Sequence, residues 1–266
     1  MRTRTSLDGW VVVVTGASSG NGKAIALALA SKGARVVLAA RRVRLLEAVA
    51  REAEDLGAEA LVVPCDVTDP GQVRNVAGAA VERWGRIDGW VNCAGVIVWS
   101  LFEDTATEEF RRTLDVNLMG SVYGAQAALP VMRRQGSGVI VNIASIAGLV
   151  AFPTQTAYAA SKAALLVFGE AFRRELRGSG MRVCQVLPTG VNTAGFLPTR
   201  TRGFPKRVTW LLQNPETVAR AVVRCLEQRW VRNIPLGLQG KATLAVGALA
   251  PPSNRRPERL YRSPRR

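Results

Sequence analysis

Short, nearly uninterrupted apolar runs rich in β-branched residues recur along the chain, and amphipathic stretches separate them. Runs of this length and composition are typical of strands that are buried on both faces of a sheet. The stretches between them have helical periodicity, so the pattern repeats a strand–helix–strand unit, which builds a parallel sheet with right-handed crossovers. We therefore predict an α/β fold with a doubly wound parallel sheet of about seven strands and helices on both faces. Six strands can be placed, at residues 11–14, 35–38, 60–63, 88–91, 139–142 and 183–186.

Length and composition favour one domain. A chain of 266 residues with 48% hydrophobic residues can bury one large core. We expect this domain to span residues 1–235, and residues 236–266 to form a short apolar helix and a flexible basic tail. No apolar run reaches the ~18 residues of a membrane span, and no signal peptide is recognisable, so the expected location is the cytoplasm.

The ionisable residues limit the kinds of catalytic site, metal site and partner that we expect for this chain. The sequence contains no His, which excludes Ser–His and Cys–His nucleophile pairs and His-containing metal sites. The four cysteines stand singly, so we expect reduced thiols and no metal site. The net charge of +16 is spread along the chain without an RNA-binding motif, so we expect no nucleic-acid partner. The basic tail is expected to make at most a weak contact with an anionic membrane surface.

The segment from Thr15 to Gly22 follows the first strand and opens a predicted helix over residues 23–31. Glycines permit a tight turn and a close approach of the backbone to a pyrophosphate, which then lies against the unpaired N–H groups of a helix N-terminus. Strand, loop and helix together favour a dinucleotide site over an ordinary strand-to-helix turn. The candidate cofactor-binding residues of this loop are Gly16, Ser18, Ser19, Gly20, Asn21 and Gly22.

Arg41 and Arg42 follow the second strand. A basic residue here suits the 2′-phosphate of NADP, whereas folds that bind NAD usually place an Asp or Glu here for the ribose hydroxyl. The alternative is two solvated arginines at a strand end. After the third strand, Asp66 and Val67 are candidates for the adenine edge, although Asp66 could instead cap the helix that begins near Pro70.

Tyr158 and Lys162 stand four residues apart in an Ala- and Leu-rich stretch that predicts a helix from Thr156 to about Arg177. Residues at i and i+4 share a helix face, with Cβ atoms roughly 5–6 Å apart. A neighbouring cation favours the phenolate, so Lys162 is expected to lower the pKa of Tyr158 and to allow proton transfer near neutral pH. The same spacing also arises by chance in many helices.

Over roughly residues 8–230 the chain resembles the short-chain dehydrogenase/reductase family, which has a Rossmann-type fold. The glycine loop resembles the family's T-G-x-x-x-G-x-G motif, and Tyr158 with Lys162 matches its Y-x-x-x-K motif. Asn117 and Ser145 match two further catalytic positions, and the separation of 13 residues between the serine and the tyrosine (158 − 145) is also that of the family. The N-x-A-G segment after the fourth strand is matched at Asn92, Ala94 and Gly95.

The resemblance implies a mechanism. A nicotinamide would exchange a hydride with a carbonyl or secondary alcohol substrate, Ser145 would hydrogen-bond the substrate oxygen, and Tyr158 would be the general acid or base. Lys162 would bind the nicotinamide ribose and lower the Tyr158 pKa, Asn117 would bend its helix and hold a water beside the lysine, and Asn92 would support the sheet and contact the adenosine ribose. We expect NADP(H) as the preferred cofactor and NAD(H) as the alternative. The competing interpretation is a non-catalytic NADP-binding sensor or scaffold.

Two segments depart from the family pattern. Asn21 stands where the family usually has an apolar residue between two glycines, which is expected to alter contacts near the nicotinamide. After the sixth strand, Pro188 and Gly190 are separated where many relatives have them adjacent. Pro188, Val191 and Thr193 can still be matched to cofactor contacts, the last two to the nicotinamide carboxamide.

The substrate and the assembly are predicted from apolar residues. A pocket lined by them favours a bulky apolar carbonyl or alcohol, although the same residues could pack under a loop or at a subunit contact. The predicted helix around Lys162 is apolar nearly all round from Ala163 to Phe168, which indicates a second partner. By resemblance that partner is another copy, in a homodimer or homotetramer. The apolar pocket candidates are Ile97, Val98, Trp99, Leu149, Val150, Phe152, Pro153, Phe196, Leu197, Phe204 and Trp210.

Overall fold

The computed structural model describes residues 5–191, 213–228 and 233–236. Seven parallel strands form one sheet in the order β3-β2-β1-β4-β5-β6-β7, which confirms the predicted fold class. The seventh strand has three residues and no apolar run marks it, so the sequence pattern did not locate it. The strands are β1 Val11–Thr15, β2 Arg35–Ala40, β3 Ala60–Pro64, β4 Gly89–Asn92, β5 Gly138–Ile143, β6 Met181–Leu187 and β7 Asn233–Pro235.

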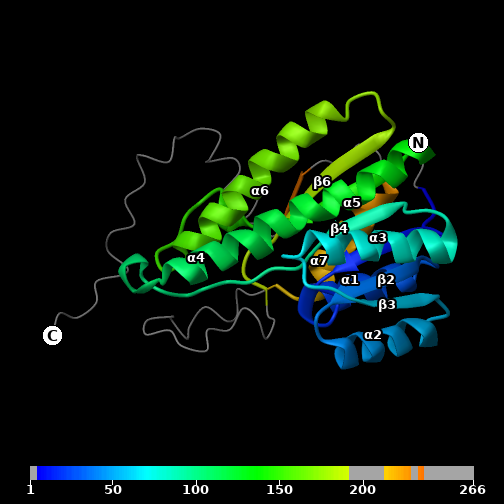
Figure 1. Ribbon diagram of the computed structural model, residues 1–266, viewed down its shortest axis with the longest axis horizontal. Helices are drawn as coiled ribbons and strands as arrows, with labels where there is room; N and C mark the ends of the chain where they lie inside the picture. Colours follow the sequence, from blue (N-terminus) through cyan, green and yellow to red (C-terminus); the bar gives the residue numbers. More distant parts are fainter. Residues whose placement is uncertain (1–4, 192–212, 229–232, 237–266) are drawn as a thin grey trace.

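Helices cover both faces of the sheet (Figure 1). Because successive side chains of a strand point to opposite faces, Val12 and Val14 of β1 enter one core and Val11 and Val13 enter the other. Figure 1 shows α2 and α3 on opposite sides of β2 and β3. The first core packs against α1 Gly20–Ala30, α2 Val43–Asp55 and α7 Pro215–Glu227. The second packs against α3 Pro70–Trp84, α5 Gly120–Gln135 and α6 Thr156–Glu175.

Two helix boundaries differ from the prediction, and the alternative role of Asp66 as a helix cap is not observed. Helix α1 begins at Gly20 rather than at Lys23, so the last glycines of the loop belong to its first turn. Helix α6 ends at Glu175. Asp66 does not cap α3; instead Asp69 Oδ1 accepts hydrogen bonds from the backbone N–H groups of Gly71 and Gln72, at 2.7 and 3.2 Å.

The order of the strands brings distant loops together. The chain runs outward from β1 through β2 to β3 and then returns to place β4 on the other side of β1. The loops that follow β1 and β4 therefore run in opposite directions and leave a crevice between them. Ligands of such sheets bind in this crevice. The loop after β5 lies at the same edge, because β5 pairs with β4 in parallel. Of the predicted helix and tail over residues 236–266, all but Leu236 lie outside the described residues.

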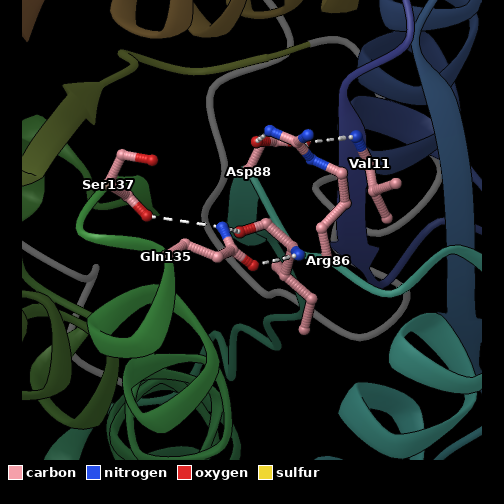
Figure 2. A network of polar contacts seen from close by, with 6 residues as sticks. Val11, Arg86, Asp88, Gln135 and Ser137 are labelled. Atoms are coloured by element: carbon pink, nitrogen blue, oxygen red, sulfur yellow. Dashed lines mark hydrogen bonds and ion pairs between the residues drawn. The ribbon is translucent and has the colours of Figure 1, made fainter.

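A buried carboxylate joins two strands at the opposite, amino-terminal edge of the sheet (Figure 2). Asp88 directly precedes β4 and is 5% exposed. Its Oδ2 accepts hydrogen bonds from the backbone N–H of Val11, at 2.9 Å, and from Arg86 Nε, at 2.8 Å. The second carboxylate oxygen accepts from Arg86 Nη2 at 2.7 Å. Nearby, Gln135 at the end of α5 hydrogen-bonds both the N–H and the carbonyl of Ile87.

We predict that Asp88→Ala destabilises the protein by about 1–3 kcal/mol, because the variant leaves the buried Val11 N–H without a partner. Urea denaturation followed by circular dichroism measures this loss. Asp55→Ala, at the exposed end of α2, is the matched control and should change the free energy of unfolding by less than about 0.5 kcal/mol. Equal stability of the two variants would contradict the structural role of the Asp88 network.

Candidate active site

The glycine loop after β1 is packed tightly against the loop after β4. Gly16 has φ +69°, and a Cβ atom there would lie only 2.8 Å from Ala94 Cα. A Cβ atom on Gly22 would overlap the carbonyl group of Gly16. Thr15 Oγ1 accepts hydrogen bonds from the N–H groups of Cys93 and Ala94, at 3.0 and 3.2 Å, and so fastens the two loops together. Thr15 was part of the predicted motif, but no local pattern indicates this role.

The first turn of α1 is suited to an anion. Ser19 is the N-cap residue, and its side chain makes no capping hydrogen bond. Unpaired N–H groups at a helix N-terminus bind phosphate, and the glycines let the backbone approach it closely. The residues present therefore fit the dinucleotide pyrophosphate that the sequence predicts.

The two arginines after β2 differ in their contacts. Arg42 Nη2 donates hydrogen bonds to the hydroxyl groups of Ser18 and Ser19, at 2.9 and 2.6 Å, which places its guanidinium beside the glycine loop. Arg41 turns to the loop after β3, where its Nη1 lies 3.6 Å from Asp66 Oδ2. Only Arg42 therefore joins the glycine loop.

Asp66 and Val67 lie after β3, as predicted for the adenine edge. Partial burial raises the pKa of Asp66, but hydrogen bonds from Thr68 and the charges of nearby arginines outweigh it, so the pKa is below its usual value. Val67 is buried, and a Cβ atom on Gly120 would lie 2.9 Å from its Cγ2. The Val67 side chain thus packs against the start of α5.

Lys162 is buried beneath the loops that follow β4 and β5. Its Nζ donates a hydrogen bond to the carbonyl oxygen of Ile143 at 2.8 Å. A Cβ atom built on Gly95 would lie 3.8 Å from Lys162 Nζ and 3.2 Å from Asn117 Oδ1. The lysine therefore reaches from α6 to the end of β5, beside the N-x-A-G segment.

Asn117 connects three separate parts of the site. It lies in the π-helical turn Asp115–Met119 between α4 Thr107–Leu114 and α5, where the resemblance predicts a bend. Its Oδ1 accepts from the N–H of Val96 at 2.8 Å, and its Nδ2 donates to the Val96 carbonyl at 2.9 Å and to Ser161 Oγ at 3.0 Å. Ser161 in turn donates to the Tyr158 carbonyl at 2.7 Å. Sequence reasoning missed Ser161, whose only signal is a hydroxyl between the tyrosine and the lysine.

Ser145 meets Tyr158 although a loop separates them. Ser145 caps the short 3₁₀ turn Ile146–Gly148, where its Oγ accepts from the N–H of Ala147 at 3.1 Å. A Cβ atom on Gly148 would lie 2.7 Å from the Lys162 backbone, so this turn packs directly on α6. The arrangement brings Ser145 near enough to Tyr158 for its side chain to lower the pKa of the phenol.

The predicted direction of the Tyr158 pKa shift is wrong for this structure. Burial raises the pKa of Tyr158, and the hydrogen bond with Ser145 lowers it by less. Burial also lowers the pKa of Lys162 to about 8. The lysine Nζ donates a hydrogen bond to the Ile143 carbonyl and lies 5.7 Å from the centre of the Tyr158 ring. Desolvation is thus the larger effect on the pKa of Tyr158, and the phenol is neutral at pH 7.

Asn92 supports the sheet from inside. Its Oδ1 accepts from Trp90 Nε1 at 2.8 Å, and its Nδ2 donates to the Ser121 carbonyl at 3.2 Å and to Asn142 Oδ1 at 2.9 Å. Both ends of the amide are thus used within the protein. The predicted contact of Asn92 with the adenosine ribose would therefore have to be made by its backbone.

The segment after β6 returns to the same edge of the sheet. The Pro188 carbonyl accepts from the N–H of Ile146 at 3.0 Å, next to Ser145, and Val191 forms a β-bridge with Gln213. Thr193 and the apolar residues predicted between 196 and 210 lie outside the described residues.

Within the ranges that the structure describes, no three His, Cys, Asp or Glu side chains are grouped to hold a metal ion. No helix in those ranges is long and apolar enough to cross a membrane.

Comparisons with known proteins identify the family. A family model described as short chain dehydrogenase matches residues 10–202. An uncharacterized oxidoreductase of Staphylococcus aureus (strain USA300) is 37% identical over 227 residues, which cover 84% of this chain and 94% of that protein. An alcohol dehydrogenase from the archaeon Thermococcus sibiricus, solved as a complex with 5-hydroxy-NADP, is 31% identical; the match covers 86% of this chain and 95% of that chain, with a TM-score of 0.76.

A glycine betaine reductase of Emericella nidulans is 38% identical over 228 residues, 84% of this chain, but the match spans only 18% of that longer protein. The family model nevertheless covers most of the chain, and the oxidoreductase relative matches along nearly its whole length. The chain therefore belongs to the short-chain dehydrogenase/reductase family, and it is an NAD(P)-dependent oxidoreductase of CH–OH and C=O groups.

Proposed function

We propose that the protein is an NADP-dependent oxidoreductase in which Tyr158 exchanges a proton with the oxygen of a bulky apolar carbonyl or secondary alcohol substrate. One observation carries this proposal: a half-buried Tyr158 phenol with a raised pKa lies near Ser145, and the Lys162 ammonium is held 5.7 Å from the centre of its ring. A neutral phenol is a proton donor, which is what carbonyl reduction needs. Residues 1–235 are proposed to form the catalytic domain.

The cofactor, when bound, supplies the hydride. The glycine loop and the start of α1 would hold its pyrophosphate, and Tyr158 and Lys162 would bind the nicotinamide ribose. The preference for NADP rests on Arg42, because its guanidinium lies against two serine hydroxyls beside the loop and can add a charge-assisted hydrogen bond to a 2′-phosphate. The remaining residues assigned to cofactor binding are Asp66, Val67, Asn92, Ala94, Gly95, Pro188, Val191 and Thr193.

Ser145 and Asn117 have different roles in the proposal. Ser145 Oγ accepts a hydrogen bond from the Ala147 N–H, and we propose that its hydroxyl hydrogen turns from Tyr158 to the substrate oxygen when substrate binds. Asn117 acts as a positioning residue, since its amide ties the loop after β4 to α6 through Ser161. The return of the proton to Tyr158 through Lys162 and a water near Asn117 stays a prediction.

An apolar rim beside these residues supports the proposed substrate class. Leu149 and Phe152 are 39% and 43% exposed, and Leu101 and Phe102 are 49% and 69% exposed. The Ser100 N–H donates to the Thr154 carbonyl at 2.9 Å, so the loops that carry these side chains are joined. Large apolar side chains at a site mouth favour an apolar ligand.

Helix α6 supports the proposed homodimer or homotetramer. Val167 lies on its outer face and is 71% exposed. A helix that covers a sheet normally presents polar residues outward. We propose that this face meets a second copy of the chain.

Tyr158→Phe tests the proton donor. We expect kcat on a panel of aromatic, cyclic and short-chain ketones to fall by about 10²–10⁴, because only the hydroxyl is lost. The Kd for NADPH, measured by fluorescence titration, should rise by no more than about fivefold, since one hydrogen bond to the ribose is worth about 1 kcal/mol. Tyr123→Phe on α5 is the matched control and should keep the wild-type kcat. Retained turnover in Tyr158→Phe would refute the assigned role.

Arg42→Ala tests the cofactor preference. Loss of a charge-assisted hydrogen bond should raise the Kd for NADPH by about 10- to 100-fold. The Kd for NADH should change little, because NADH lacks the phosphate. Arg41→Ala should have a smaller effect on NADPH, since that guanidinium is already close to Asp66. Equal losses for NADPH and NADH in Arg42→Ala would show that the preference for NADP is mistaken.

The Lys162 pKa of about 8 predicts a linkage between pH and cofactor binding. The cofactor-free protein loses the Lys162 proton as the pH rises through that value. A bound anionic cofactor favours the ammonium and raises this pKa. At about pH 8.5, binding should therefore take up a proton, and NADPH affinity should fall as the pH increases. Calorimetry in two buffers of different ionisation enthalpy measures the uptake, which should vanish in Lys162→Met and persist in the exposed control Lys32→Met.

A further inference from the structure

Asn21 carries a buried polar atom that the protein leaves unpaired. The Asn21 Oδ1 is shielded from solvent and has no hydrogen-bond partner. Native proteins rarely keep a buried acceptor in this state, because it loses its hydrogen bonds to water and gains none in return. Such an atom at a ligand site indicates a donor that arrives with the ligand.

The position of Asn21 places this atom at the cofactor cradle. Asn21 is the second residue of α1, between Gly20 and Gly22. Residues three and four positions further on share its helix face, and these are Ala24, which packs against the first core, and the fully buried Ile25. Helical side chains lean toward the N-terminus of their helix. The Asn21 amide therefore lies on the inner face of α1, toward the glycine loop.

The chemistry of a nicotinamide dinucleotide limits which of its groups can pair with Oδ1. The pyrophosphate oxygens only accept hydrogen bonds at neutral pH, so they cannot serve an acceptor. Arg42 donates hydrogen bonds to Ser18 and Ser19. In the proposed function, the adenosine half of the cofactor binds on this side of the loop. The ribose hydroxyls of the other half are assigned to Tyr158 and Lys162 in the proposed function. The donor that is left is the NH₂ group of the nicotinamide carboxamide.

We propose that Asn21 Oδ1 accepts a hydrogen bond from the carboxamide NH₂ of the bound nicotinamide, which makes Asn21 a specificity-determining residue for the nicotinamide end of the cofactor. This inference rests on the proposed function, because it requires a nicotinamide cofactor in the cleft. An apolar side chain at this position would fill space but accept nothing. With Asn21 at this position, the protein distinguishes a carboxamide from a similar group that has no N–H.

A comparison of two ligands tests the contact. The 3-acetylpyridine analogue of NADP⁺ has a methyl group in place of the NH₂, so it cannot donate. Isothermal titration calorimetry gives the Kd of both ligands for wild type, Asn21→Leu and Asn21→Ala. Wild type should bind NADP⁺ about fivefold more tightly than the analogue. The ratio of the two Kd values should be smaller in both Asn21 variants than in wild type. Asn75→Leu, an exposed asparagine on α3, is the matched control and should keep the wild-type ratio.

A ratio in the Asn21 variants that equals the wild-type ratio would overturn the inference. A third ligand, adenosine 2′-phosphate 5′-diphosphate, keeps the phosphates and lacks the nicotinamide ring. The Asn21 variants should bind it as wild type does; an equal loss of affinity for this fragment and for NADP⁺ would place the amide on the phosphates and also overturn the inference. If wild type binds neither NADP⁺ nor NADPH, the proposed function itself fails, which is a distinct result.

Discussion

The site depends on a close contact between the loop after β1 and the loop after β4. The backbone of Gly16 lies so near Ala94 that no side chain fits between them, and the Thr15 hydroxyl accepts hydrogen bonds from two N–H groups of the facing loop. This contact sets the start of α1 beside the N-x-A-G segment. Because Gly95 lies near both Lys162 and Asn117, the same contact connects the cofactor loop to the catalytic candidates.

Buried polar groups fix the orientation of α6. Lys162 is bonded to the end of β5, and Ser161 is bonded to Asn117 in the turn before α5. Each of these groups would be costly to bury alone, so the hydrogen bonds compensate for desolvation and also set the position of the helix. Tyr158 stands at the first turns of this helix and reaches Ser145 as a result. The chemistry thus depends on contacts between elements rather than on α6 alone.

Burial and charge act against each other in this site, and burial is the larger effect in the cofactor-free protein. It raises the pKa of Tyr158 and lowers that of Lys162 to about 8. A neutral phenol beside a lysine that is easily deprotonated is prepared to donate a proton, and an incoming anion would restore the lysine charge. The cofactor and the proton chemistry are therefore coupled through one buried ammonium group.

The sequence by itself determined the parallel sheet, the glycine loop and the candidate residues, because each of these is written in local patterns of period, turn chemistry and spacing. Strand runs predicted six of the strands, while β7 has too few residues to form a pattern. Tertiary structure alone decided that Asp69 rather than Asp66 caps α3, and that Arg42 rather than Arg41 reaches the loop. It also set the direction of the Tyr158 pKa shift, since desolvation depends on atoms that surround a group in space and not on its neighbours along the chain.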